Sequence, residues 1–307
     1  MQELSFRDRL KRLASRWNPS GALIGDVQAK AAIKLLRERP ADASVASLLE
    51  AERVYKAAVH PVLEQPIPSF FRHGSFMPVT SLCAMGMVSS KAPGGLLLFH
   101  WLYQSHSAGM RYCNYADTSR PLDAQLMLKA YGLSTLAAWT VAFGSQRVVD
   151  KIPRLRLLGL ILPHAAVGCA GAISTVVNAA HDLEAGVGFS DASGASLGMS
   201  RAVAQASVAR AVLFHSVLIP GCALLAPVLA MRFLVVPRLL RSSPALIPLS
   251  SAALTIGCTC VMTPFAAATC PPVISVPTSA LEPENQEKVR DVCAAPPERV
   301  WSDRILY

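Results

Sequence analysis

The side chains best suited to hold a ligand gather at the end of an apolar stretch, between Trp101 and Asn114. The group includes Gln104, Ser105 and Tyr112, whose amide and hydroxyl groups both donate and accept hydrogen bonds. An apolar segment that ends in such a cluster is typical of a polar site embedded in a membrane. The alternative is structural, because polar side chains in helical bundles often bond to neighbouring helices.

Two arginines beside apolar runs are further candidates. Arg210 opens an apolar run, and an arginine within a membrane needs a partner, so it is a functional candidate unless it lies at the membrane edge. Arg111 lies near the end of its segment and can hold a carboxylate through two parallel hydrogen bonds. Extension of the Arg111 side chain toward lipid headgroups is the more ordinary role.

The remaining candidate motifs favour structure over chemistry. His60-Pro61 is interpreted as a helix end, because proline disfavours helix at the residue before it. The seven histidines are scattered, the eight cysteines form no Cys-x-x-Cys pair, and no Ser/His/Asp arrangement or glycine-rich phosphate loop occurs. We therefore expect no catalytic residue, structural metal, disulfide framework or cofactor, and we do not expect an enzyme.

The composition is that of an integral membrane protein. Only 16% of the 307 residues are charged, against about 25% in soluble domains, and the mean hydropathy is +0.37. No Asp, Glu, Lys or Arg occurs in residues 157–180, 211–231 or 242–281. The net charge of +9 comes from short loops and the N-terminal segment, without a nucleic-acid-binding signature.

These uncharged runs predict an all-α membrane protein with about five transmembrane helices and an N-terminal helical cap, since crossing ~30 Å of hydrocarbon takes about 20 apolar residues. The predicted spans are 94–107, 126–144, 157–177, 211–231 and 245–269. The predicted organisation is a cap over 1–72, a transmembrane bundle over 73–270 and a polar C-terminal tail over 271–307.

Residues 73–90 admit two interpretations. Pro93 and the glycines after it should break a helix. Either residues 73–107 form a broken span whose halves dip toward a site, as in many transporters, or an interfacial helix precedes one true span.

The cap should contain three helices. Residues 4–16 form a basic amphipathic segment, similar to a mitochondrial presequence or a helix lying on a membrane surface. The alternative is a solvated basic helix. Apolar periodicity predicts two further helices over 23–39 and 44–59, too polar to cross a membrane.

Charge in the loops predicts the orientation. Loops 145–156 and 232–241 are rich in Lys and Arg, whereas loop 178–202 is mostly acidic. With five spans, the basic N-terminal segment falls on the same side as both basic loops. The positive-inside rule then places the N-terminus inside and the C-terminal tail outside.

The order of these features resembles the sideroflexins, five-span proteins of the mitochondrial inner membrane. The segment from Leu49 to His60-Pro61 resembles the family's helix and its His-Pro-Asp-Thr-Gly-Glu box. Trp101-Leu-Tyr-Gln-Ser-His-Ser-Ala108 stands where the family has Trp-Ile-Asn-Gln-Ser-Phe-Asn-Ala, and Tyr112-Cys-Asn114 stands on its Tyr-Thr-Asn. Further matches are the Phe6-x-x-Arg9 start, the Asp191–Gly198 hairpin, Arg210, Thr263-Pro264 and Ser279-Ala-Leu-Glu282.

The chain departs from the family pattern at several polar positions. The His-Pro box has lost its Asp and its Gly-Glu pair. Tyr103, Ser107 and Arg111 replace family asparagines, and Tyr115 replaces an arginine. Polar family positions in the third span are Gly171 and Ser174 here.

The resemblance implies two functions. The first is a mitochondrial inner-membrane transporter of serine or other small neutral amino acids, with Gln104, Ser105, Tyr112, Asn114 and Arg210 at the substrate. A zwitterion needs donors for its carboxylate and acceptors for its ammonium group. The second is a transport-inactive accessory subunit of a respiratory-chain or ATP synthase assembly.

The same resemblance implies the surroundings of the protein. Its N-terminus is expected in the matrix and its C-terminus in the intermembrane space. Expected partners are a serine-like amino acid, membrane lipids including cardiolipin at the basic loops, and, for an accessory subunit, a larger inner-membrane complex. No nucleic-acid partner is expected.

Overall fold

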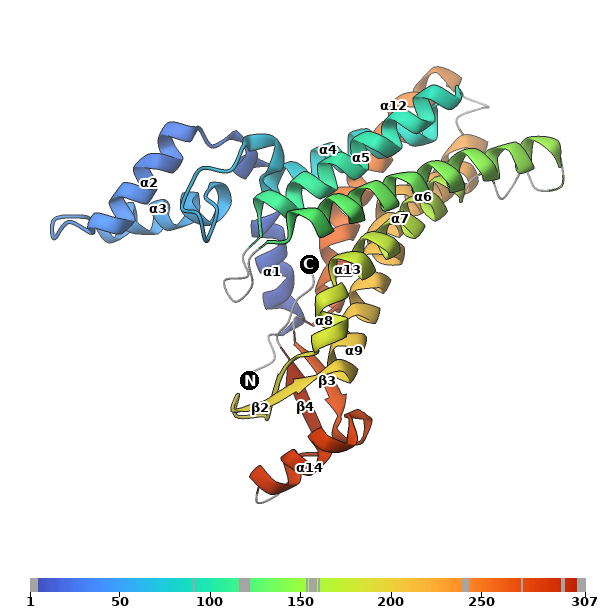
Figure 1. The fold of residues 1–307 in the computed structure, drawn as a ribbon. Coiled ribbons are helices and arrows are strands. Elements are labelled where there is room, and N and C mark those ends of the chain that lie inside the picture. Colours follow the sequence, from blue (N-terminus) through green and yellow to red (C-terminus); the bar gives the residue numbers. More distant parts are fainter. Residues whose placement is uncertain are drawn as a thin grey trace.

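The computed structural model describes residues 5–90, 92–115, 122–152, 154, 159, 161–238, 243–271, 273–293 and 296–302. Four parts can be followed in Figure 1: a helical hairpin at one end, a group of long helices, a helix near the N-terminus beside them, and a small sheet with its own helix.

The N-terminal part is helical, as predicted. Helix α1 is Phe6–Arg16, a 3₁₀ turn covers Pro19–Leu23, and the hairpin consists of α2 (Asp26–Glu38) and α3 (Val45–Ala58). The Ser44 hydroxyl accepts a hydrogen bond from the Ser47 amide at 3.1 Å and begins α3. The hairpin is held by small apolar residues, since Ala29, Ala32, Ala51 and Ala58 are all buried between its helices.

Four helices then lie side by side in Figure 1. They are α4 (Phe76–Ser89), α5 (Pro93–Cys113), α6 (Ala124–Lys151) and α7 (Leu162–Asn178), preceded by the 3₁₀ turns Ser69–Phe71 and His73–Ser75. Pro93 occupies the first turn of α5, where its missing N–H has no helical partner to lose. Residues 73–107 thus contain two separate helices, α4 and the first part of α5.

Two longer helical stretches follow, each interrupted by π-helical turns. The first runs from α9 (Arg201–Leu213) through Phe214–Leu218, Gly221–Leu225, α10 (Ala226–Ala230) and Met231–Val235. The second contains the 3₁₀ turn Pro244–Leu246, α12 (Ile247–Gly257), the π turn Cys258–Met262 and α13 (Thr263–Thr269). Pro220, Pro227 and Pro264 lie in or beside these irregular turns, because proline cannot donate the usual helical hydrogen bond.

The chain is mostly helical, as expected, but it is not all-α, because a four-stranded antiparallel sheet is present. Its strands are β1 (Val187–Ser190), β2 (Ser196–Ser200), β3 (Ile274–Pro277) and β4 (Arg299–Ser302), in the order β2-β1-β4-β3. Short helices α8 (Ala180–Ala185) and α14 (Pro283–Val292) and the turn Thr278–Ala280 flank the strands. Strands of four or five residues alternate Val, Phe and Ile with polar residues, a signal that long apolar windows hide.

The sheet joins the C-terminal tail to the middle of the chain. Strand β4 pairs with β1 through Ser190 and Trp301, and with β3 from Ile274 to Pro277. One buried core forms around the sheet, α9 and α14, and includes Val187, Phe189, Val203, Ile274, Val276, Val289 and Val300.

Three helical stretches are long and apolar enough to cross a membrane: Ala124–Val149, Arg201–Arg238 and Ile247–Thr269. They contain the predicted spans 126–144, 211–231 and 245–269, apart from the first two residues of the last. The predicted span 94–107 lies within α5, and 157–177 overlaps α7, with residues 157, 158 and 160 outside the described residues. A count of five spans is not confirmed.

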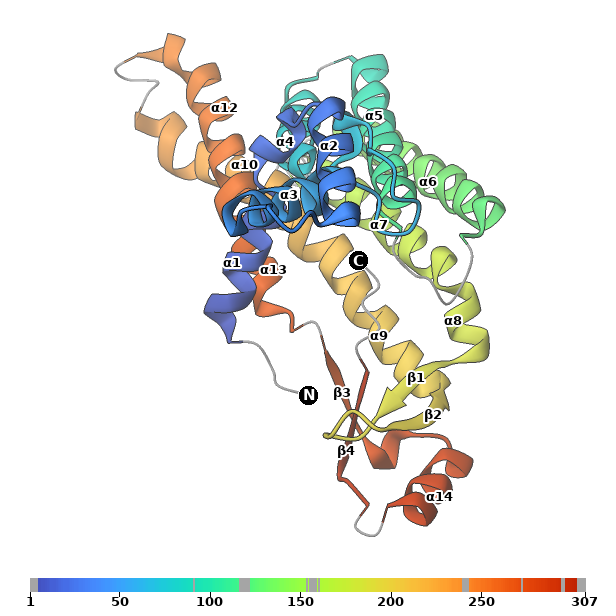
Figure 2. The ribbon, with the colours of Figure 1, turned by 90° about the vertical axis from the view of Figure 1, so that its left-hand side faces the viewer.

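Helix α1 packs against α13, as both views of the fold show (Figures 1 and 2). The Phe6 and Phe265 rings meet edge to face at 5.1 Å, and the Arg9 Nε donates to the Ala268 carbonyl at 2.8 Å. Leu13 and Trp17 pack on the cluster that contains Ala267. The basic amphipathic segment therefore has a partner within the chain.

Candidate functional site

Gln104 lies in the interior of the helical bundle, beside a second buried polar residue. Gln104 is 5% exposed and His100, one helical turn earlier on α5, is fully buried. Within the part of the chain that the structure describes, the Gln104 Nε2 and both His100 ring nitrogens have no hydrogen-bond partner. Leaving such groups unpaired costs ~1–3 kcal/mol each, so a ligand or water that pairs with them is favoured.

A small cavity lies between α4, α5, α7 and the long helix. Thr80 of α4, Tyr103 of α5 and Pro220 of the long helix line it, with apolar residues around them. Its volume is about 10 Å³, room for about one water molecule. Thr80 Oγ1 is also buried, with no partner among the described residues. The cavity is therefore small and mostly apolar, with the Thr80 hydroxyl at its wall.

Ser105 connects α5 to α6. Its hydroxyl lies 2.9 Å from the Tyr131 hydroxyl, and eight residues earlier the Leu97 carbonyl accepts a hydrogen bond from the Trp139 indole at 3.0 Å. The two contacts run in opposite directions along the helices, so α5 and α6 are antiparallel. Ser105 is therefore paired with Tyr131 in this structure.

Asn114 and His106 fix the end of α5 to the preceding turns. Asn114 Nδ2 donates to the Phe71 carbonyl at 2.7 Å and to the Met110 carbonyl at 2.8 Å. The buried His106 Nε2 lies 3.0 Å from the Phe70 carbonyl, and its ring contacts the Phe70 and Phe71 rings. Asn114 thus acts structurally in this conformation.

The other predicted substrate residues do not converge on Gln104. Tyr112 is 56% exposed. Arg210 lies on α9, where its Nη1 donates to the Val273 carbonyl just before β3 at 3.1 Å. Arg210 therefore joins the long helix to the segment that leads into the sheet. Of the five predicted residues, Gln104 alone combines burial with an unpaired amide nitrogen among the described residues.

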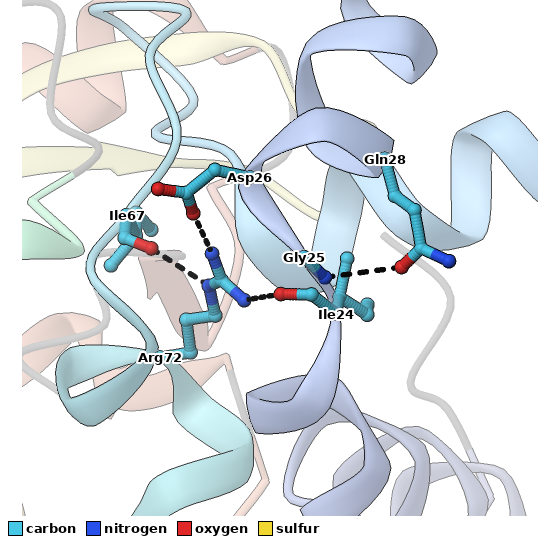
Figure 3. Close-up of polar contacts among 6 residues, drawn as sticks. All are labelled: Ile24, Gly25, Asp26, Gln28, Ile67 and Arg72. Atoms are coloured by element: carbon cyan, nitrogen blue, oxygen red, sulfur yellow. Dashed lines mark hydrogen bonds and ion pairs between the residues drawn. The ribbon is translucent and has the colours of Figure 1, made fainter.

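A buried arginine holds the N-terminal hairpin to the bundle. Figure 3 shows the Arg72 guanidinium surrounded by three acceptors: its Nε donates to the Ile67 carbonyl at 2.7 Å, its Nη1 to the Ile24 carbonyl, and its Nη2 to Asp26 Oδ1 at 2.9 Å. Arg72 is fully buried, whereas the Asp26 side chain is 71% exposed. In the same view the Gly25 amide donates to Gln28 at the start of α2.

This arginine also connects to α5. The Arg72 carbonyl accepts a hydrogen bond from the Ser75 hydroxyl at 2.7 Å, and that hydroxyl lies 3.3 Å from His106 Nε2. Because His106 and Gln104 share α5, the hairpin is linked to the helix that carries the candidate site through a short series of buried polar contacts.

The two proline motifs have structural positions. His60 follows the end of α3, and its Nδ1 accepts hydrogen bonds from the Val62 and Leu63 amides, each at 3.1 Å. Burial lowers the pKa of His60, which favours the neutral ring that accepts these bonds. Pro61 is exposed in the turn that follows, and Pro264 is buried in the first turn of α13.

Helix α7 approaches the backbone of the long helix very closely. A Cβ atom on Gly168 would lie 2.6 Å from the Ser216 carbonyl oxygen, and one on Gly171 would lie 2.8 Å from the His215 carbonyl oxygen. Only glycine permits this separation, as at many helix contacts in membranes. Gly171, a polar position in the family pattern, is therefore occupied by a backbone contact here.

Glu282 joins the C-terminal tail to the start of the long helix. Its Oε1 accepts from the Arg201 and Ala202 amides at 2.7 and 2.9 Å. Its Oε2 accepts from Ser200 and Asn285, each at 2.8 Å. Partial burial raises the pKa of Glu282, but the hydrogen bonds from Asn285, Ser200 and Ala202 outweigh it and lower the pKa to about 2.

Substitution Glu282→Gln should lower the unfolding temperature by roughly 2–8 °C at pH 7, because a charged acceptor at a helix N-terminus is lost. The pKa of Glu282 is depressed from its ordinary 4.5 to about 2, so its stabilising effect is complete above pH 4.5 and fades as pH falls toward 2. Thermal unfolding of both proteins across this range should show the difference shrinking. A difference that stays constant would contradict this role.

Several residues important to this arrangement were not singled out as site residues by sequence. His100 and Thr80 lie in apolar runs, and only helical spacing from Gln104 relates His100 to it. Arg72 carries no local signal, because its acceptors are 5 to 48 residues away. Glu282 appeared only as part of a matching tail motif.

Among the described residues, no group of three or more His, Cys, Asp or Glu is placed to hold a metal ion. All eight cysteines are free. The site therefore consists of amide, hydroxyl and imidazole groups.

Long apolar helices that enclose unpaired polar groups define a helical membrane protein with a polar interior. The model of the family "Sideroflexins" matches residues 2–304. The chain therefore belongs to the sideroflexin family, as its motifs indicated.

Curated relatives are similar over most of the chain. Sideroflexin-5 of Rattus norvegicus is 25% identical over 295 residues, 92% of this chain and 85% of that protein. Sideroflexin-1 of Ovis aries is 24% identical over 298 residues, which are 94% of this chain and 90% of that protein. Sideroflexin-3 of Mus musculus is 25% identical over 298 residues, which are 93% of this chain and 90% of that protein. No solved structure matches the chain.

Proposed function

We propose that this sideroflexin carries serine or another small neutral amino acid across a membrane. The observation that supports the proposal is a set of buried polar groups on α4, α5 and α6 that have no hydrogen-bond partner among the described residues: Thr80, His100, Gln104 and Thr135. Donors and acceptors held ready inside a bundle bind a polar solute without first breaking other contacts. In this mechanism, separation of the helices enlarges the small cavity and admits the substrate.

The chemistry suits a zwitterion. The Gln104 Nε2 and the hydroxyl of Thr80 can donate to the carboxylate, while hydroxyl and carbonyl oxygens accept from the ammonium group. The helices that form the bundle contain one acidic residue, Asp150 near the end of α6. The site thus offers hydrogen bonds in place of a negative charge, which favours a solute with no net charge.

The test is uptake of L-serine by the purified protein in liposomes. We expect saturable uptake, and a decrease of about 10-fold or more in kcat/KM for Gln104→Ala, which corresponds to ~1.4 kcal/mol of lost binding. Gln125→Ala, at an exposed position of α6, is the matched control and should transport like the parent protein. Equal uptake by both variants would place the substrate elsewhere.

The second candidate is a transport-inactive accessory subunit. It is favoured by the small volume of the cavity beside Tyr103 and by the tight backbone contact at Gly171. If folded protein shows no uptake or exchange of any small neutral amino acid, this candidate replaces the first. A stable respiratory-chain or ATP synthase partner should then co-purify with the protein.

The C-terminal tail weighs against a need for such a partner. Its strands pair with β1, its helix α14 packs on β2, and Glu282 binds the start of α9. The tail is thus ordered by contacts within its own chain, and no second protein is required to explain its structure.

The proposed location is the mitochondrial inner membrane, with anionic lipids such as cardiolipin at the basic loops. The loop charges favour a matrix N-terminus and a C-terminus in the intermembrane space. Helix α1 packs on α13, and α13 leads into the C-terminal sheet. This packing favours an arrangement with both termini on the same side of the membrane. Labelling of cysteines introduced at each terminus, from one side of the membrane, distinguishes these two arrangements.

A further inference from the structure

His100 is the most deeply buried ionisable group in the candidate site. Its side chain has no exposed surface, and neither ring nitrogen has a partner in the described part of the structure. It lies four residues before Gln104 and therefore on the same face of α5. An ionisable residue inside a membrane bundle is costly, and it needs an explanation beyond packing.

The contacts of α5 define which ionisable groups lie near His100. The antiparallel contacts Ser105–Tyr131 and Leu97–Trp139 place His100 opposite the α6 turn around Leu136. That turn carries hydroxyl groups, of which Thr135 Oγ1 is buried and has no partner among the described residues. Asp150 lies 14 residues farther along α6, roughly 20 Å away at the helical rise.

The elements packed on His100 supply no carboxylate at its level. The titratable residue of α4 is Cys83, and the 3₁₀ turn Ser69–Phe71 has none. The remaining titratable or charged residues on α5 and α6 are Tyr103, His106, Arg111, Tyr112, Cys113, Lys129, Tyr131, Arg147, Asp150 and Lys151.

Among the described residues of these elements, a protonated His100 thus has no anionic partner at its level, and an unpaired charge in that environment is strongly disfavoured. The carboxylate of a bound amino acid would be the missing anion. At low dielectric the attraction between the two charges is large, so binding of the carboxylate and binding of the proton favour each other.

We infer that transport is coupled to protons through His100. The inference rests on the proposed transport function. One proton from the water on the entry side binds the free ring nitrogen of His100 together with one zwitterion, and both leave on the exit side. The cycle returns His100 to its neutral form and moves one positive charge per amino acid, with no other bond made or broken.

The experiment measures uptake of radiolabelled L-serine by proteoliposomes with the lumen one pH unit more alkaline than the medium. For one proton per serine we expect accumulation to rise up to about 10-fold over vesicles without a gradient, since one pH unit corresponds to a tenfold concentration ratio. A pH-sensitive dye in the lumen should report acidification that begins when serine is added. A negative potential inside should increase uptake further.

The variant His100→Gln keeps a polar side chain but cannot bind the proton. We expect it to retain measurable, though reduced, exchange of internal for external serine, and to lose both the accumulation and the dye signal. His181→Gln, at an exposed position of α8, is the control and should respond to the gradient like the parent protein.

The possible results separate coupling from transport. Exchange without gradient-driven accumulation or acidification in the parent protein overturns the role of His100 and leaves the proposed function standing. Gradient-driven accumulation in His100→Gln equal to that of the parent also overturns it. Absence of any exchange in the folded parent protein overturns transport and coupling together. Should His100→Gln fail to fold, the dye signal in the parent protein and His100→Asn decide the question.

Discussion

Substitution of Arg72 by alanine is expected to destabilise the protein by about 3 kcal/mol or more and to lower its unfolding temperature by roughly 6–12 °C. The guanidinium is fully buried and donates to Ile67, Ile24 and Asp26 (Figure 3). Its removal leaves two buried carbonyl groups unpaired and opens a void between the hairpin and the bundle. Thermal unfolding in detergent measures the loss, and limited proteolysis should show α2 and α3 cleaved first.

Asp26→Asn is the matched control for Arg72→Ala. The Asp26 side chain is 71% exposed, and an ion pair with one partner in water contributes little, typically under ~1 kcal/mol. We therefore expect a change of less than about 3 °C. Equal losses for the two variants would show that the charge pair, and not the hydrogen bonds to the two carbonyl groups, holds the hairpin.

Gly168→Ala should disrupt the contact between α7 and the long helix. The new Cβ would lie 2.6 Å from the Ser216 carbonyl oxygen, a backbone atom that cannot rotate away. Overpacking of this kind costs ~1–3 kcal/mol. Pro220 lies four residues after Ser216 and lines the cavity beside Tyr103. Separation of these helices should therefore also reduce serine uptake by ~5-fold or more.

Gly132→Ala tests the same chemical change where the structure has room. No atom lies within 4 Å of a Cβ built on Gly132 of α6, and alanine favours helix by up to ~1 kcal/mol over glycine. Its unfolding temperature should be unchanged or slightly raised. If Gly168→Ala behaves in the same way, close packing at α7 does not limit the stability or activity of the protein.

The helices of the N-terminal hairpin were predictable because their causes are local. Apolar periodicity over 23–39 and 44–59 matches α2 and α3 to within three residues. Capping groups such as Ser44 act over three residues of sequence. The three helical stretches long and apolar enough to cross a membrane were found for the same reason, since composition within one window decides them.

The sheet was missed because its partners are distant in sequence. Strands β1 and β4 pair through Ser190 and Trp301, 111 residues apart. No window of a membrane-helix scale contains both. The register of such a pair is set by burial against α9, which no local pattern reveals.

The candidate site was predictable by residue type but not by geometry. Gln104 is buried, and its amide nitrogen has no partner among the described residues. Asn114 and Arg210 also carry hydrogen-bond donors, yet each donates to a backbone carbonyl of another segment. Which polar groups are consumed by the fold depends on where carbonyls of other segments lie, and sequence alone does not give this.

The carboxylate of Glu282 has a consequence for the order in which the protein matures. The amide of Arg201 that it accepts from lies 81 residues earlier in the chain, and a ribosome makes the N-terminal part first. The long helix therefore emerges with its first turn open and is closed only after the tail has been synthesised. Completion of the C-terminal unit is thus a late step in assembly, and a chain that stops before Glu282 would retain an open helix start.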